Sequence, residues 1–120
     1  MKVEKGYKFK FYINAKHSVD FGEGQSSIHP HTWEIVLYIR VKNDKMINFT
    51  KFESVLEEYF DQYEGKYLNE MERFKGEDPT MERIGLTLYE DIYLSVSKTS
   101  IYLEQLEISE NPTRTYIIKS

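Results

Sequence analysis

With 120 residues, 40% of them hydrophobic and 15% aromatic, the chain suits one globular domain, which we place over residues 1–120. Its net charge of −4, its scattered lysines and arginines and its lack of long apolar runs exclude nucleic-acid binding and a membrane span. It has no cysteine, which excludes disulfides and thiolate chemistry, and it has no recognisable secretory leader, so we expect a cytoplasmic protein.

Two segments near the N-terminus alternate in hydrophobicity. In residues 7–18 the odd-numbered positions are mostly apolar and the even-numbered ones polar, which is typical of a strand with one buried face. Residues 31–42 alternate in the same way, with Val36 as the exception. Residues 19–28 hold two glycines and two serines, so they are predicted to form the loop of a long antiparallel hairpin.

The hydrophobic period then changes to that of a helix. From Phe49 onward, apolar residues recur at intervals of three and four, and Gly65 ends the pattern. Thr50 and Glu53 form a capping-box pattern at the start of this helix. Residues 66–78 are polar and are predicted to form a loop.

A second helix and two strands complete the chain. Asp78 is the predicted cap of this helix, Pro79 suits its first position, and the apolar pattern continues to about Ser97. The β-rich segments 101–109 and 113–118 follow, with a turn between them. The order ββααββ predicts an α+β fold, an antiparallel sheet with two helices on one face. Open sheet edges are normally paired or blocked, so we expect a homo-oligomer.

The three histidines of the chain all lie between positions 17 and 31. On a strand, the side chains of His29 and His31 point to the same side, about 6–7 Å apart. His17 ends the preceding strand, at a position with the same parity as that strand's apolar residues. It comes alongside His29 and His31 if the two strands pair. Three neutral imidazoles suit zinc and leave a fourth position open, as in catalytic sites, although iron and nickel also accept imidazole. Ordinary core or loop histidines are the alternative.

Six segments, in order along nearly the whole chain, read NAKHSV, HPHTWEI, MINFTKFESVL, KYLNE, DPTMERIG and SENPTRTY. Together they resemble motifs of the 6-pyruvoyltetrahydropterin synthase and 6-carboxytetrahydropterin synthase family. The resemblance implies one such domain with a tunnelling fold (T-fold), whose sheets assemble around a central barrel in a trimer or a dimer of trimers.

The resemblance also implies the site. It places zinc at His17, His29 and His31, a pterin ring at Glu110, and a further substrate contact at Thr80. Glu110 shares the parity of the apolar residues before it, and a carboxylate accepts two N–H bonds from a guanidine-like edge. Without the resemblance, Glu110 would be interpreted as a solvated turn residue. In this family zinc acts as a Lewis acid on the side chain of dihydroneopterin triphosphate.

The positions for proton transfer depart from the family pattern. The usual base is a cysteine four residues before the H-x-H motif, where this chain has Gln25. The family's Asp-His pair is replaced by Glu64 and Gly65. Some relatives use a glutamate in place of the cysteine, so Glu23, in the same loop, and Glu64 are the candidate catalytic residues. Loss of one general base lowers a rate by roughly 10²–10⁴-fold.

Three functions are therefore open. The first is a zinc-dependent lyase acting on 7,8-dihydroneopterin triphosphate, with Glu23 or Glu64 as the base. The second is a catalytically inactive zinc-containing paralogue that binds a pterin- or purine-like heterocycle. The third is a structural oligomeric paralogue in which the histidines hold a loop. The product of a lyase would serve a deazapurine (queuosine), folate or biopterin pathway, and the sequence does not choose among them.

Overall fold

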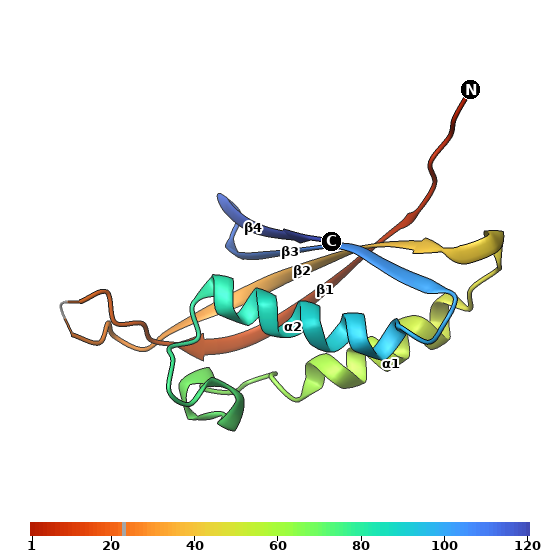
Figure 1. Ribbon diagram of the computed structural model, residues 1–120. Coiled ribbons are helices and arrows are strands. Elements are labelled where there is room, and N and C mark those ends of the chain that lie inside the picture. Colours follow the sequence, from red (N-terminus) through yellow and green to blue (C-terminus); the bar gives the residue numbers. More distant parts are fainter. Residues whose placement is uncertain (23) are drawn as a thin grey trace.

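A computed structural model describes residues 1–22 and 24–120 of the protein. Its elements follow one another as β1 (Tyr7–His17), β2 (His29–Val41), α1 (Phe49–Asp61), α2 (Met81–Val96), β3 (Ile101–Asn111) and β4 (Arg114–Lys119). Within the described residues, the four strands form one antiparallel sheet in the order β1-β2-β3-β4, and α1 and α2 lie on the same face of it (Figure 1). The predicted ββααββ fold is confirmed. No helix in this part of the chain is long and apolar enough to span a membrane.

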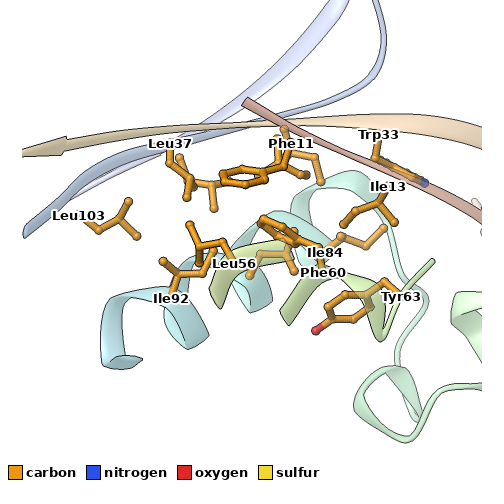
Figure 2. Packing of buried hydrophobic residues seen from close by; sticks show 14 of the residues in the cluster. Phe11, Ile13, Trp33, Leu37, Leu56, Phe60, Tyr63, Ile84, Ile92 and Leu103 are labelled. Carbon is orange, nitrogen blue, oxygen red and sulfur yellow. The ribbon is translucent and has the colours of Figure 1, made fainter. Parts of the chain in front are cut away.

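The core lies between the sheet and the two helices (Figure 2). Residues of one parity in β1 and β2 face it, as the alternation predicts, and Phe11 of β1 meets Phe60 of α1 with ring centroids 5.1 Å apart. Val36, the exception to the pattern, is buried on the opposite face with 4% exposure. Its register partners there are Lys10 and Glu107, whose aliphatic stems can cover it while their charges stay in water.

The first helix has a different cap from the predicted one and is shorter. The side chain of Asn48 accepts a hydrogen bond from the backbone N–H of Lys51 at 3.0 Å, so Asn48 is the N-cap and the capping box at Thr50 is wrong. The helix ends at Asp61, and Gly65 adopts a φ of 73° beyond it. This conformation lets the Gly65 N–H donate to the carbonyl of Asn14 at 2.6 Å, on the open edge of β1.

The loop predicted over residues 66–78 contains short 3₁₀-helices at Leu68–Glu70 and Glu72–Phe74. Leu68 and Phe74 are each 2% exposed and belong to the core. The segment carries many polar residues, but these two apolar side chains anchor it in the core. The segment connects the two helices as a loop, as predicted, but its 3₁₀-helices and buried residues were not predicted, because two isolated apolar residues give no periodic signal.

The start of the second helix also differs from the prediction. Thr80 is the N-cap, and its hydroxyl accepts a hydrogen bond from the N–H of Arg83 at 3.1 Å. Pro79 lies outside the helix. The carboxylate of Asp78, the predicted cap, instead accepts the N–H of Asp20 at 2.7 Å and so ties the β1–β2 loop to the entry of α2. Asp78 does not cap α2 because its carboxylate is hydrogen-bonded to Asp20 instead.

Gly85 is the point where α2 approaches the sheet most closely. A Cβ atom there would lie 2.8 Å from Ile108 Cγ2 and 3.2 Å from Ile118 Cδ1. Overpacking a core costs typically about 1–3 kcal/mol, against a helix-propensity gain of up to about 1 kcal/mol for alanine. We expect Gly85→Ala to lower the free energy of unfolding by about 1 kcal/mol in urea denaturation. A variant as stable as the wild type would contradict this close approach.

Candidate metal site

The β1–β2 hairpin brings the three histidines to one end of the sheet. Strand β2 begins at His29, two residues earlier than predicted, and His29 is the register partner of His17. The ring centroids are 4.4 Å apart for His17 and His29, 4.8 Å for His29 and His31, and 5.2 Å for His17 and His31. One ligating nitrogen from each ring lies within 4.8 Å of the others. The predicted ligands therefore converge on one point.

Backbone carbonyls orient two of the rings. His17 Nδ1 lies 2.8 Å from the carbonyl oxygen of Pro79, and His29 Nδ1 lies 2.9 Å from that of Ser27. A carbonyl oxygen only accepts hydrogen bonds, so each Nδ1 carries the proton and donates it. In the neutral ring, Nε2 then presents a lone pair. Such outer partners are typical of metal-ligating histidines, whose orientation and basicity they set.

The segment that carries Pro79 is held by Arg83 of α2. Its guanidinium donates to the carbonyl oxygen of Phe74 at 3.2 Å and to that of Arg73 at 3.0 Å, and it also donates to the carbonyl of Glu77. These bonds satisfy backbone carbonyls that no regular element pairs. They fix the turn that delivers the Pro79 carbonyl to His17, so the orientation of His17 depends on α2.

Two nitrogens of the cluster have no hydrogen-bond partner. The Nε2 atoms of His17 and His31 are buried, and nothing in the described part of the chain donates to them or accepts from them. Burial lowers the pKa of both imidazoles, which keeps the rings neutral at pH 7. A buried polar atom without a partner costs about 1–3 kcal/mol. Neutral imidazoles bind metal ions through a ring nitrogen, so these residues suit a metal ion.

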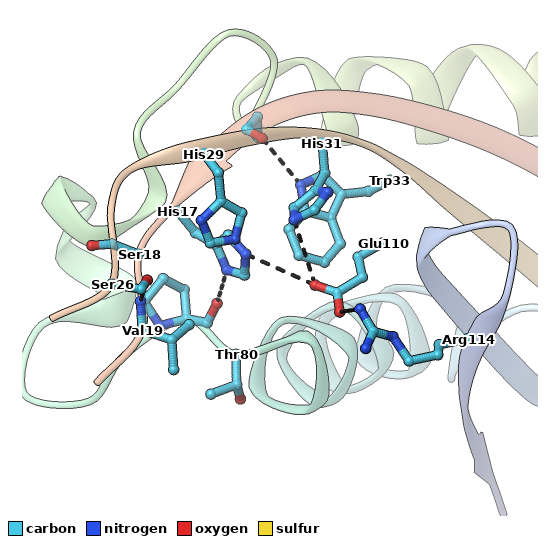
Figure 3. A network of polar contacts seen from close by, with 12 residues as sticks. His17, Ser18, Val19, Ser26, His29, His31, Trp33, Thr80, Glu110 and Arg114 are labelled. Atoms are coloured by element: carbon cyan, nitrogen blue, oxygen red, sulfur yellow. Dashed lines mark hydrogen bonds and ion pairs between the residues drawn. The ribbon is translucent and has the colours of Figure 1, made fainter. Parts of the chain in front are cut away.

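Glu110 lies beside the histidines at the end of β3. Its Oε2 is 3.8 Å from His17 Nε2 and 3.6 Å from His31 Nε2, and its Oε1 is 3.1 Å from Nη2 of Arg114. Figure 3 shows the carboxylate between the imidazoles and the guanidinium. The side chain of Glu110 is only 16% exposed, so it is no solvated turn residue. Its inward orientation agrees with the parity of β3.

These residues line a cavity of about 490 Å³. Its lining includes the three histidines, Thr80, Glu110 and Arg114. A cavity of this size falls in the range of roughly 300–1,000 Å³ that holds small ligands. The cavity thus combines a set of metal-ligating nitrogens with a carboxylate and a cation.

The sequence of residues 7–120 matches a family model described as 6-pyruvoyl tetrahydropterin synthase. The chain belongs to the 6-pyruvoyl tetrahydropterin synthase family. A comparison with curated proteins gives no match. Of the solved structures, the 6-pyruvoyl tetrahydropterin synthase of Caenorhabditis elegans has a TM-score of 0.80 at 16% identity, over 97% of this chain and 95% of that chain.

Two further structures show the same fold. The 6-pyruvoyl tetrahydropterin synthase of Plasmodium vivax has a TM-score of 0.68 at 15% identity, over 98% of this chain and 99% of that chain. An uncharacterized protein from Wolinella succinogenes has a TM-score of 0.67 at 11% identity, over the same shares of the two chains. The T-fold of the domain, which the sequence motifs predict, is confirmed by this likeness.

The residues considered for proton transfer are Glu23, Glu64 and Gln25. Glu23, one candidate base, lies outside the described residues. Glu64 is the other candidate base, and it lies on the edge of β1. Its carboxylate accepts hydrogen bonds from the backbone N–H of Asn14 at 2.9 Å and from Asn14 Nδ2 at 2.8 Å. Glu64 is not among the residues that line the histidine cavity. Gln25 donates from Nε2 to the hydroxyl of Ser18 at 3.0 Å.

Sequence reasoning missed Arg114 and the carbonyls of Pro79 and Ser27. Arg114 had a usable signal, since it stands four residues after Glu110 across a two-residue turn, where opposite charges on paired strands meet. The carbonyls had none, because every residue has one and only the folded chain decides which of them meets an imidazole.

The lowered pKa values make the stability of the metal-free family member depend on pH. The imidazoles of His17 and His31 have pKa values below the ordinary 6.5, so the unfolded chain takes up protons first as the pH falls. Their contribution to stability is present above about pH 6.5 and is lost as the pH falls through the folded pKa values. We expect urea denaturation to show a lower free energy of unfolding at about pH 5.5 than at about pH 7.5. The decrease should be smaller in His17→Gln, and equal decreases would contradict the expectation.

Proposed function

We propose that this chain is a zinc-dependent pterin-processing lyase that acts on 7,8-dihydroneopterin triphosphate. The convergence of three imidazoles, two of them oriented by backbone carbonyls, beside a carboxylate in a cavity of a family member carries the proposal. His17, His29 and His31 would hold the metal, with His17 and His31 binding it through the buried Nε2 atoms that lack partners among the described residues. When bound, zinc supplies Lewis-acid polarisation of substrate oxygens.

The other residues of the cavity have roles that follow from their chemistry. The carboxylate of Glu110 is suited to accept two N–H bonds from the guanidine-like edge of a pterin, and charge-assisted pairs of this kind are strong. Thr80 lines the same cavity, although its hydroxyl is engaged in capping α2. Its proposed contact with substrate would therefore use the remaining capacity of that hydroxyl.

The proton-transfer step requires a base within hydrogen-bond reach of the reacting carbon. Glu23 and Glu64 remain the candidates. Glu64 would have to release Asn14 to act, so Glu23→Gln is the more informative variant and Glu64→Gln its companion. Loss of turnover in one variant, with zinc content unchanged, would identify the base.

A second candidate function is an inactive paralogue that binds a pterin- or purine-like heterocycle. One observation favours it: the family's cysteine position holds Gln25, whose amide cannot act as a base, and Glu64 is engaged by Asn14. This candidate keeps the metal and the cavity and predicts binding without product.

One experiment separates these functions. The purified protein is analysed for metal by elemental mass spectrometry and incubated with 7,8-dihydroneopterin triphosphate, and the products are separated by chromatography. Near-stoichiometric zinc with a new pterin product supports the lyase. Zinc with unchanged substrate supports the binding paralogue. A protein without zinc after expression in zinc-supplemented medium would contradict both.

We also propose that the protein is a homo-oligomer, a trimer or a dimer of trimers with sheets joined into a barrel. Part of the β1 edge is covered, because the backbone of Asn14 and Lys16 is hydrogen-bonded to that of Gly65 and Lys66. The rest of β1 and the outer edge of β4 have no strand partner in the described chain. Unpaired edges are ready to pair with another copy. Light scattering after size exclusion should give three or six times the 14.4 kDa chain mass, and a monomer would contradict the proposal.

A further inference from the structure

One carboxylate oxygen of Glu110 faces the Nε2 atoms of two of the histidines. His17 donates from Nδ1 to the Pro79 carbonyl, so its Nε2 bears a lone pair, and the Glu110 oxygen lies 3.8 Å from it. The same oxygen lies 3.6 Å from His31 Nε2. Both separations exceed the 2.7–3.2 Å of a typical N–H···O hydrogen bond. The lone pair of His17 Nε2 and the Glu110 oxygen are both electron-rich, and such atoms repel each other in a partly buried site unless a cation lies between them.

The same separations suit ligands of one ion. In a tetrahedral zinc site with bonds of about 2.0–2.1 Å, two donor atoms are roughly 3.4 Å apart. The Glu110 oxygen is 3.6 and 3.8 Å from the two imidazole nitrogens that lack any other partner. The oxygen thus faces the point on which the histidine nitrogens converge.

Arg114 holds the other oxygen of the same carboxylate at 3.1 Å. The side chain of Asn111 stiffens the turn between Glu110 and Arg114. Its amide oxygen accepts hydrogen bonds from the N–H of Thr113 at 2.9 Å and from the Thr113 hydroxyl at 2.7 Å. A metal-ligating carboxylate is itself hydrogen-bonded by an outer partner that orients it. Arg114 occupies that place here, and it keeps the second oxygen turned toward the histidines.

We propose that in the ligand-free protein Glu110 is the fourth protein ligand of the metal and Arg114 positions its carboxylate. The chain then closes its own coordination sphere, as in structural sites, instead of leaving the position open. This inference rests on the proposed zinc site. It has a consequence for the pterin site as well, because Glu110 must leave both the metal and Arg114 before it can hold a guanidine-like edge.

The test compares zinc affinity in the wild type, Glu110→Gln, Arg114→Gln and the control Glu107→Gln. Glu107 lies on the same strand, but its parity is that of the opposite face of the sheet. Affinity is measured by competition with a chromophoric chelator. We expect Glu107→Gln to match the wild type, Arg114→Gln to bind zinc roughly 10–100-fold more weakly, and Glu110→Gln to lose at least as much.

A second readout separates coordination from folding. Cobalt(II) is substituted for zinc, and the visible spectrum, which reports the ligand set, is compared between the wild type and Glu110→Gln; circular dichroism of the metal-free proteins checks that both fold. A changed spectrum with weaker zinc binding supports the proposal. Equal affinities and equal spectra would overturn it and leave the three-histidine site intact. A wild type that binds no zinc would overturn the zinc site itself.

Discussion

His17→Ala is expected to lower zinc affinity by more than about 100-fold, because loss of an outer partner alone costs roughly 10–100-fold and this change removes a ligand. His17 is 2% exposed and its ring is held by the Pro79 carbonyl, so its other nitrogen is oriented before a metal binds. A preoriented ligand loses little freedom on binding. Zinc content after dialysis against a chelator measures the effect.

The matched control is Lys16→Ala. Lys16 is the preceding residue of β1 and is exposed on the other face of the sheet, so this variant should retain wild-type zinc content. Stoichiometric zinc in His17→Ala would show that the metal is held elsewhere. Circular dichroism of both variants would confirm that the sheet is intact.

Phe60→Ala is expected to lower the free energy of unfolding by about 3–5 kcal/mol, the usual range for removing a buried aromatic ring. Phe60 is 3% exposed and packs on Phe11 of β1, at the contact between α1 and the sheet (Figure 2). The substitution leaves a cavity that the rigid sheet cannot close. Denaturation in guanidinium chloride measures the loss in the free energy of unfolding. The protein concentration is kept fixed, since an oligomer's apparent stability depends on it.

Val55→Ala is the control on the same helix. Val55 is 54% exposed, so its truncation should change the free energy of unfolding by no more than about 0.5 kcal/mol. Similar losses in Val55→Ala and Phe60→Ala would contradict the packing of α1 described above. Because the two positions share one helix, a difference between them reports burial rather than helix propensity.

Most of the fold was predictable because its signals are local. Alternation along residues 7–18 and 31–42 identifies two strands and their buried faces, since side chains point to opposite sides at each step. The three- and four-residue spacing after Phe49 identifies a helix for the same kind of reason. Boundaries were less predictable: α1 ends at Asp61 because the next residues run along the edge of β1.

The sequence by itself was enough to predict which residues could ligate a metal. His17, His29 and His31 have matching parity on adjacent strands, and an antiparallel hairpin leaves them one place to meet. It also determined that the chain has no cysteine, which is a matter of residue identity and needs no structure.

Only the tertiary structure decided how these residues are used. It placed the Glu110 carboxylate toward the histidines and Arg114 against it, engaged Glu64 with Asn14, and brought the Pro79 carbonyl to His17. Each of these contacts joins atoms from different elements at distances of a few ångströms. Such distances depend on strand register, turn geometry and the docking of α2, and hydrophobic periodicity carries no information about them.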